Sequence, residues 1–238
     1  MAIDIDGMWR EFLRLCNQNF VAGNRWKFIT DGLRNTLLIT LFALILGLLI
    51  GFTVALVRVT FDTTGRLKPL NALTKLYVTV IRGTPMVLQL LIIYYVIFRS
   101  VNIDKIFVAI LGFGINSGAY VSEIFRAGIM SVDTGQMEAG RSLGLNYNQT
   151  MWRVIMPQAI KNVLPAIGNE CITLLKETSI AGYIAVQDLT MGANIIRSLT
   201  YEPFFPLVGA AVIYLALVML LQAGVGALER RLAKSDRR

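Results

Sequence analysis

Five long apolar stretches, separated by shorter polar segments, run along the 238-residue chain. A helix needs about 20 predominantly apolar residues to cross the hydrocarbon core of a bilayer. Each stretch approaches or exceeds this length, so the pattern predicts an all-α integral membrane protein with five transmembrane helices in one domain, residues 32–228. The predicted spans cover residues 33–57, 76–98, 106–130, 158–175 and 204–228.

Helix-breaking residues interrupt two of the predicted spans. Arg82, Gly83 and Pro85 stand early in the second span, where a proline removes a backbone donor and kinks a helix. The interruption is consistent with a functional hinge, and equally with a simple kink whose arginine reaches the aqueous interface. Pro157 directly precedes the fourth span, and Pro165 lies within it. We take these five positions as hinge or structural candidates.

The segments outside the spans differ in character. Residues 1–31 mix aromatic side chains with both signs of charge, which is typical of an amphipathic helix at the membrane interface. For residues 1–7 a poorly ordered tail is an equally good interpretation. Residues 176–203 are mixed and predict one or two short helices at the outer face. Residues 229–238 are rich in arginine and predict a basic cytoplasmic tail.

Composition supports a membrane protein and argues against several kinds of site. Hydrophobic residues make up 55% of the chain and charged residues 16%, whereas soluble domains have roughly 25% charged residues. The chain has no histidine, and Cys16 and Cys171 have no neighbours at metal or redox spacing, so we expect no metal site and no disulfide framework. The net charge of +8 is spread over the loops between spans, so we expect no nucleic-acid partner.

Lysine and arginine are distributed unevenly between the two sides of the predicted membrane domain. The three polar segments on the side of the C-terminus hold 13 of these cations, and the three on the side of the N-terminus hold 8. The segments on the side of the C-terminus are 58–75, 126–161 and 229–238. Those on the side of the N-terminus are 1–31, 99–105 and 176–203. Because loops rich in lysine and arginine stay in the cytoplasm, the distribution predicts an extracytoplasmic N-terminus and a cytoplasmic C-terminus.

A polar and basic stretch, residues 131–157, separates the third and fourth spans on the predicted cytoplasmic side. In it, Glu138-Ala139-Gly140 is followed after three residues by Gly144, and after nine more by Val154-Ile155-Met156-Pro157. This spacing resembles the EAA loop of bacterial ABC importer permeases. The chain departs from the family pattern at three positions, where Gly140, Val154 and Met156 replace alanine, isoleucine and leucine.

Further segments are similar to the polar amino acid uptake subfamily of these permeases. They include residues 82–85, 120–126 and 175–179, and the similarity extends from about residue 26 to the C-terminus. The resemblance implies a type I ABC importer permease fold in the bacterial inner membrane. It also implies a second permease subunit, identical or paralogous, two cytoplasmic ATPases and an extracytoplasmic amino-acid-binding protein. The chain lacks a GxxxxGK[ST] phosphate-binding motif, so ATP and Mg would be bound by the partner ATPase, and this chain would have no cofactor and no enzymatic activity.

The resemblance also implies that residues 133–149 form a coupling helix that docks on the ATPase. Glu138 would stand at the start of this helix, with Ser131 or Asp133 as its cap. Small residues would let the helix sit closely in a groove of the ATPase, and an ordinary solvated loop helix is the alternative. The candidate coupling residues are Gly135, Glu138, Ala139, Gly140, Gly144 and Leu145.

Polar residues in the middle of the spans are the candidates for substrate contact. Asn169 and Glu170 follow Pro157 by about 18 Å along a helix at about 1.5 Å per residue, near mid-membrane. A buried carboxylate without a partner is costly, so a cationic substrate would stabilise Glu170; a neighbouring arginine or an added proton would do the same. Family members that carry basic amino acids resemble this Asn-Glu pair, which implies a polar and preferably basic amino acid as substrate. Asn116 and Tyr120 are candidates for the opposite wall.

Two other functions are compatible with the sequence. An ion-coupled secondary amino acid transporter could pass protons through Glu123 and Glu170, although such transporters usually show two related halves. A structural subunit of a larger membrane complex could use the polar loop for docking alone.

Overall fold

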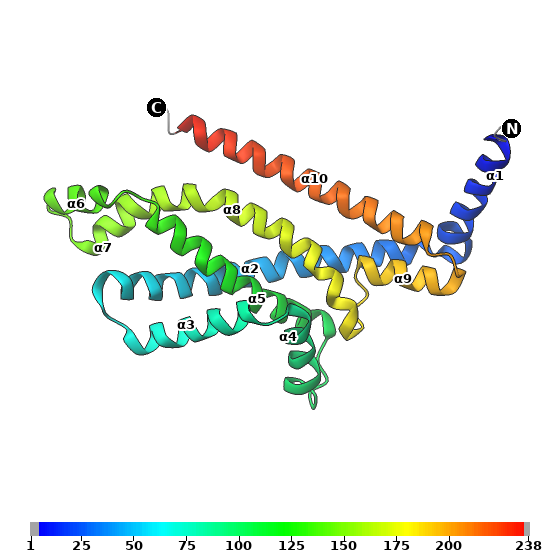
Figure 1. Ribbon diagram of the computed structural model, residues 1–238, viewed down its shortest axis with the longest axis horizontal. Helices are drawn as coiled ribbons and strands as arrows, with labels where there is room; N and C mark the ends of the chain where they lie inside the picture. The colour runs from blue at the N-terminus through cyan, green and yellow to red at the C-terminus, as the bar shows by residue number, and fades with distance from the viewer. Residues whose placement is uncertain (1–4, 236–238) are drawn as a thin grey trace.

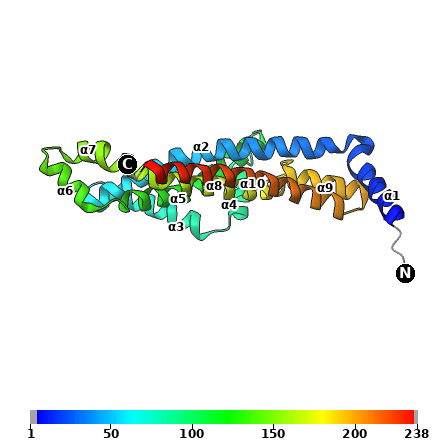
Figure 2. The same cartoon turned by 90° about the horizontal axis from the view of Figure 1, so that it is seen from above.

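The helices form one elongated bundle, described for residues 5–235 in a computed structural model (Figure 1). Every regular element in this part of the chain is helical, as the apolar pattern predicts. The longest helix, α2, follows the long axis of the bundle. α6 and α7 lie at one end and α1 and α9 at the other, in this view and in the view from above (Figure 2). The α-helices are α1 (Ile5–Cys16), α2 (Trp26–Thr64), α3 (Lys68–Gly83), α4 (Met86–Ile92), α5 (Lys105–Met130), α6 (Thr134–Ser142), α7 (Tyr147–Thr150), α8 (Met156–Glu177), α9 (Leu189–Thr200) and α10 (Phe204–Ser235). Short π-helical or 3-10 segments are η1 (Asn17–Val21), η2 (Ala22–Asn24), η3 (Ile93–Ile97), η4 (Met151–Ile155) and η5 (Thr178–Ile184).

Three of the described helices are long and apolar enough to cross a membrane alone, namely α2, α5 and most of α10. They correspond to the first, third and fifth predicted spans, and α5 begins one residue before its predicted span and ends with it. α3 and the following helical segment pass the same test only as a bent pair, which would give a fourth span. α8 occupies the fourth predicted span as a helix but is not among those that pass. The count of five spans therefore stays a prediction.

The interruption predicted at residues 82–85 of the second span is a complete break between two helices. α3 ends at Gly83, α4 begins at Met86, and the directions of the two segments differ by 110°. Pro85 explains the break, because proline disfavours the helical conformation in the residue before it. Thr84 is accordingly extended, with φ −124° and ψ 148°. Pro85 thus stands at the start of a new helix instead of kinking a continuous one.

Two helices extend beyond the predicted spans. α2 already begins at Trp26, inside the segment predicted to be interfacial, and α10 continues to Ser235, inside the predicted tail. Both helices are longer than their apolar stretches. A helix continues until its terminal backbone groups find other partners. Of these two predicted segments, residues 1–4 and 236–238 lie outside the described residues.

The segment between α8 and α10 contains two short helices, η5 and α9, as predicted. Asp188 caps α9, because its Oδ1 accepts hydrogen bonds from the backbone N–H groups of Thr190 at 2.7 Å and Met191 at 3.2 Å. Gly192 lets α9 cross α2 closely, since a Cβ there would lie 2.2 Å from the carbonyl oxygen of Phe28. These contacts fix α9 against the first turns of α2.

Glycines bring α2 and α5 close together along their length. A Cβ at Gly47 would lie 3.0 Å from the Cβ of Ser117. A Cβ at Gly51 would lie 2.5 Å from Cγ1 of Val121 and 2.9 Å from the carbonyl oxygen of Gly118. Small residues at such positions allow the backbone contact on which helix association in membranes depends. The α2–α5 pair is therefore the tight scaffold on which the other helices pack.

Gly51→Ala should destabilise the protein by roughly 1–3 kcal/mol, because the added methyl group overpacks the α2–α5 contact. Thermal unfolding of the purified protein in detergent measures the effect. Gly224→Ala is the matched control, since a Cβ at Gly224 in α10 meets nothing within 4 Å. Equal melting temperatures for the two variants would contradict the packing described for α2 and α5.

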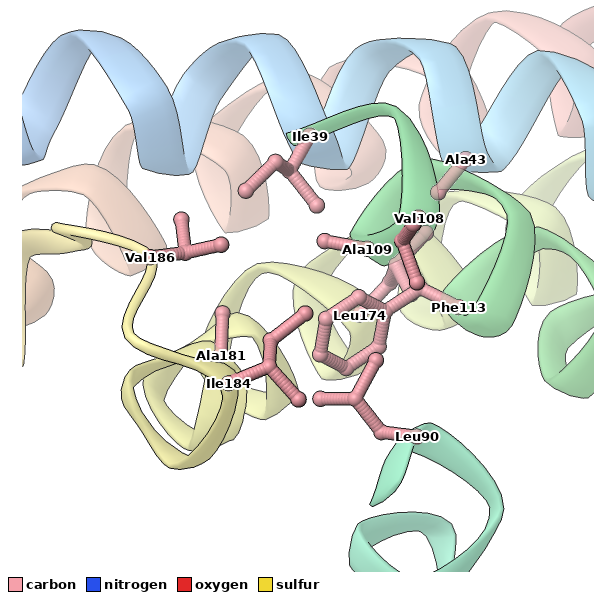
Figure 3. Close-up of a cluster of buried hydrophobic side chains, with 10 residues drawn as sticks. All are labelled: Ile39, Ala43, Leu90, Val108, Ala109, Phe113, Leu174, Ala181, Ile184 and Val186. Atoms are coloured by element: carbon pink, nitrogen blue, oxygen red, sulfur yellow. The ribbon is translucent and has the colours of Figure 1, made fainter. Parts of the chain in front are cut away.

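A buried apolar cluster sets the register between α5 and α8 (Figure 3). The ring of Phe113 from α5 lies beside Leu174 from α8 in this cluster, and the two helices run in opposite directions. One turn later on α5 and one turn earlier on α8, Ser117 and Glu170 therefore come to face each other. The members of the cluster are Ile39, Ala43, Leu90, Val108, Ala109, Phe113, Leu174, Ala181, Ile184 and Val186.

Candidate functional site

Glu170 and Ser117 meet inside the bundle, between α8 and α5. The Ser117 hydroxyl donates a hydrogen bond to Oε1 of Glu170 at 2.7 Å; Ser117 is buried and Glu170 is half-buried. None of the ion pairs found among the described residues includes Glu170. Its hydrogen-bond partner in this chain is thus a neutral hydroxyl, which supplies no positive charge to balance the carboxylate.

Asn116, a predicted substrate residue, is engaged in a structural contact. Its side-chain amide donates to Oε1 of Gln89 at 2.9 Å. The Gln89 amide in turn donates to the Ile81 carbonyl at 2.7 Å and to the Thr84 hydroxyl at 2.8 Å. Gln89 thus supplies a partner for a carbonyl freed at the α3–α4 break, as a broken helix within a membrane requires. A substrate role for Asn116 stays a prediction.

Tyr120 and Arg82 lie together beside this break. The guanidinium carbon of Arg82 is 5.2 Å from the centre of the Tyr120 ring, within the range of a cation–π contact. Both side chains are exposed, whereas Asn116 one turn earlier on α5 is buried. The helix break at Gly83 and Pro85 therefore places a cation against the face of α5 that was predicted to line the substrate path.

Asn169 is exposed on α8 and half-buried Glu170 follows it, so the two neighbours point in directions that differ by about 100°. A hollow of about 510 Å³ lies between α2, α5 and α8, lined by apolar side chains that include Phe52, Phe125 and Trp152. It contains none of the four predicted substrate residues. Among the described residues, no group of three histidine, cysteine, aspartate or glutamate side chains is placed to hold a metal ion.

Glu123 is paired with cations of its own chain. Its Oε1 accepts a hydrogen bond from Arg58, and its Oε2 lies 3.4 Å from Nε of Arg126. Arg126 also reaches Asp62 at 3.3 Å. A carboxylate balanced by two arginines is poorly suited to carry protons, so these pairs weaken the interpretation of Glu123 as part of a proton path.

The polar stretch 131–157 contains α6, α7, η4 and the start of α8, and the predicted single helix over residues 133–149 is divided into α6 and α7. Asp133 caps α6, as one of the two expected caps: its Oδ1 accepts from the Gly135 N–H at 2.6 Å. Asn146 and Gln149 cap α7 reciprocally, with two hydrogen bonds of 2.9 Å. The expectation that Glu138 starts the helix is wrong, because α6 begins at Thr134 and Glu138 is its fifth residue.

Contacts and backbone conformation within this loop explain why glycine stands at two of the candidate coupling positions. A Cβ at Gly140 would lie 2.5 Å from Cγ2 of Thr150, so α6 packs directly on α7 at this point. Gly144 has φ +83°, a backbone conformation that other residues rarely adopt, and its N–H ends α6 by donating to the Arg141 carbonyl at 3.0 Å. Their predicted role in close docking with an ATPase is not needed to explain them.

The other candidate coupling residues differ in exposure. Gly135, Glu138 and Ala139 are exposed on α6 and are available to a partner. Leu145 is half-buried, and its N–H donates to the Gly140 carbonyl at 3.2 Å. Leu143 was missed by the sequence analysis: it is 83% exposed at the turn between α6 and α7. Its signal in the sequence was an apolar residue beside the turn glycine in a polar loop, but only the backbone direction at Gly144 separates it from Leu145.

The loop is fixed to the body of the bundle. The Tyr147 hydroxyl lies 2.8 Å from that of Thr63 at the end of α2, and the Asn162 amide of α8 donates to the Ser131 hydroxyl at 2.9 Å. A buried apolar cluster next to the loop joins α2, α5, η4 and α8. It comprises Val59, Ile129, Met151, Ile155, Met156 and Ala159. A displacement of the loop must therefore be transmitted to α2, α5 and α8.

The two candidate prolines of α8 have different surroundings. Pro157 is the second residue of α8 and follows directly on the π-helical segment η4, so helical backbone continues on both sides of it. Pro165 lies inside the helix, which nevertheless continues from Met156 to Glu177. Neither proline divides α8, in contrast to Pro85 at the α3–α4 break.

Gly144→Val should impair the α6–α7 turn by about 1–2 kcal/mol, the typical cost of a left-handed conformation for a residue with a side chain. Space is not the obstacle, because a Cβ at this position meets nothing within 4 Å. Gly144→Asn is the matched control, since asparagine adopts this conformation more readily. Circular dichroism, thermal unfolding and substrate uptake should separate the two variants; equal behaviour would remove the special role of this turn.

The chain matches the family described as "Binding-protein-dependent transport system inner membrane component" over residues 43–234. It is 39% identical over 211 residues to the arginine transport system permease protein ArtQ of Bacillus subtilis, covering 88% of this chain and 94% of that protein. It is 40% identical over 210 residues to a putative glutamine transport system permease protein GlnP of Rickettsia bellii, covering 87% and 94%. A crystal structure of an amino acid ABC transporter with histidines matches with a TM-score of 0.80 and 38% identity, covering 97% of this chain and 100% of that chain. The chain therefore belongs to the family of inner membrane components of binding-protein-dependent transport systems.

Proposed function

We propose that this chain is the translocation subunit of an ATP-driven amino acid importer that prefers a cationic amino acid. The observation that carries the proposal is the Glu170 carboxylate, half-buried in the bundle against the neutral Ser117 hydroxyl. A carboxylate withdrawn from water is stabilised most by a cation, and the side chain of arginine, lysine, histidine or ornithine supplies one. The relatives named for arginine and histidine support this preference, whereas the one named for glutamine supports a neutral polar substrate.

The rest of the amino acid requires groups of other chemistry. A free amino acid carries a carboxylate, for which Arg82 offers a cation held against the Tyr120 ring. Arginine is well suited to this task because its planar guanidinium can bind both carboxylate oxygens. The amides of Asn169 and Asn116 would contribute neutral hydrogen bonds. In this arrangement the substrate would bridge from α8 to the face of α5 beside the α3–α4 break.

Transport would be driven from the end of the bundle that carries α6 and α7. The cation distribution supports a cytoplasmic position for this loop, where it would dock on ATPase subunits that bind ATP and Mg. This chain would then need no cofactor and no catalytic activity of its own. ATP binding would draw two ATPases together, and the loop would pass the movement to α2, α5 and α8 as a rigid-body rotation. A second permease subunit, identical or paralogous, would complete the path, and an extracytoplasmic binding protein would deliver the substrate.

Direct binding of amino acids to the purified permease–ATPase complex, without the binding protein, isolates the selectivity of this chain. Labelled arginine should bind, and unlabelled lysine or ornithine should displace it more effectively than glutamine or glutamate. Displacement by glutamine as effective as by lysine would contradict the cationic preference, while leaving the importer function to be tested separately by its dependence on ATP.

A further inference from the structure

The first helix presents a continuous apolar face to its surroundings. Met8, Trp9, Phe12 and Leu13 are 64%, 60%, 45% and 49% exposed. At about 100° per residue, these four side chains fall within roughly 140° of the circumference of α1. Trp9 and Phe12 are stacked, with ring centres 5.5 Å apart. Four large apolar side chains on one face of a 12-residue helix indicate a surface that is covered in the working protein.

The charged residues of α1 lie on the opposite face and balance one another. The helix carries two acidic residues, Asp6 and Glu11, and two basic residues, Arg10 and Arg14, so it has no net charge. Arg14 donates to Glu11 at 2.6 Å and 2.8 Å, and this contact lowers the pKa of the Glu11 carboxyl. A helix of this kind is held at a surface by its apolar face and not by attraction to charge.

The position of α1 selects the membrane as the surface that covers this face. α1 stands crosswise to the long axis of the bundle in both views, at the end where α2 and α10 begin (Figures 1 and 2). The ring of Phe12 lies 5.6 Å from that of Phe205, in the first turn of the apolar helix α10. The apolar face of α1 is therefore continuous with the lipid-facing surface of a membrane-crossing helix. A helix placed across the ends of such helices lies along the plane of the membrane.

α1 is also connected rigidly to the short helix α9. Asn19 in η1 is fully buried; its amide donates to the Leu15 carbonyl at 2.9 Å, and its Oδ1 accepts from the Thr200 hydroxyl at 2.9 Å. Phe20 packs on α10, since a Cβ at Gly209 would lie 3.1 Å from its ring. The anchor and the last turn of α9 therefore share one buried joint.

We propose that α1 is an in-plane membrane anchor, whose apolar face inserts among lipid headgroups and upper acyl chains at the surface opposite the α6–α7 loop. Its place in the outer leaflet rests on the proposed function, which puts that loop in the cytoplasm. Because α1 has no net charge, the anchor binds zwitterionic lipid as well as anionic lipid. Through Asn19 it holds α9 at a fixed depth beneath the membrane surface.

Nitroxide labels on the two faces of α1 test this proposal in the full-length chain, reconstituted with its ATPase in phosphatidylcholine vesicles. Leu13→Cys reports on the apolar face and Arg10→Cys on the polar face, both in a Cys16→Ala/Cys171→Ala background. Power saturation compares collisions of each label with oxygen, which concentrates in lipid, and with a water-soluble nickel chelate. The ratio of oxygen to nickel accessibility should be roughly three-fold or more higher at position 13 than at position 10. Met8→Cys repeats the measurement at the other edge of the apolar face, about 160° around the helix from position 10, and should agree with position 13.

Three results would overturn the proposal. Equal accessibility of positions 13 and 10 to the nickel chelate would place both faces in water. Protection of position 13 only after the binding protein is added would assign the face to a protein partner. Entry of position 13 into lipid only when anionic lipid is present would show that charge, and not the apolar face, holds the helix. None of these measurements depends on uptake, so a failure of the anchor is distinguishable from a failure of the importer function.

Discussion

Glu170→Gln should weaken the binding and uptake of the substrate arginine roughly ten-fold or more. The binding and uptake of glutamine as a substrate should change little. A hydrogen bond to a charged group contributes about 1.5–3 kcal/mol, and each 1.4 kcal/mol is about a factor of ten in affinity. Glutamine keeps the size of the side chain and can still accept the Ser117 hydrogen bond, so the change removes the charge and little else. Binding of labelled arginine and glutamine to the purified complex measures both effects.

Two control variants separate charge from packing in this experiment. Ser117→Ala removes the hydroxyl but leaves the carboxylate, so the preference for cations should persist. Glu177→Gln removes a second half-buried carboxylate, at the end of the same helix, and should leave the preference unchanged. An equal loss of arginine and glutamine binding in Glu170→Gln would contradict the assignment of Glu170 to the cationic group of the substrate.

Leu143→Asp should weaken association with the ATPase by about 2 kcal/mol or more, the usual effect of losing a central anchor of an interface. This corresponds to roughly a thirty-fold higher dissociation constant. The reason is that an 83% exposed leucine at the tip of the loop fits a partner's apolar groove, in which an aspartate would lie desolvated and unpaired. Titration of the purified permease with the ATPase measures the change.

Leu67→Asp is the matched control for this variant. Leu67 is 45% exposed, and it precedes α3 at the end of α2, outside the α6–α7 loop. The same change of chemistry there should leave the affinity for the ATPase within about two-fold of the wild type, as for a residue outside an interface. If both substitutions weaken binding equally, the interface does not centre on the α6–α7 turn; if neither does, Leu143 is not part of it.

The sequence was sufficient where a helix depends on its own hydropathy and caps. α5 lies within one residue of the predicted span because an apolar run coincides with it and Asp104 caps its first turn. The α3–α4 break could not be predicted from Pro85 alone. A proline inside a helix can produce a kink or a break. The break is stabilised here by Gln89, whose amide N–H donates back to the Ile81 carbonyl and whose Oε1 accepts from the Asn116 amide.

The candidate sites show the same limit. Glu170 could be identified from its depth in an apolar stretch, but Ser117 could not, because their contact depends on the register of two helices set by Phe113 and Leu174. The motif identified the polar loop between α5 and α8, but the structural roles of its glycines depend on contacts and backbone angles. Gly140 packs against Thr150, and Gly144 adopts a left-handed conformation. That turn leaves Leu143 exposed and Leu145 half-buried, a distinction that spacing along the sequence does not contain.

The α6–α7 loop is central to the proposed mechanism, because it is where the energy of ATP would enter this chain. Uptake of labelled arginine into proteoliposomes containing the permease, its ATPase and its binding protein tests this directly, with ATP on the side of the loop. Uptake should continue in the presence of a protonophore and should stop when ATP is replaced by a non-hydrolysable analogue. Uptake that persists without ATP hydrolysis and stops when the proton gradient collapses would contradict an ATP-driven importer and identify an ion-coupled transporter.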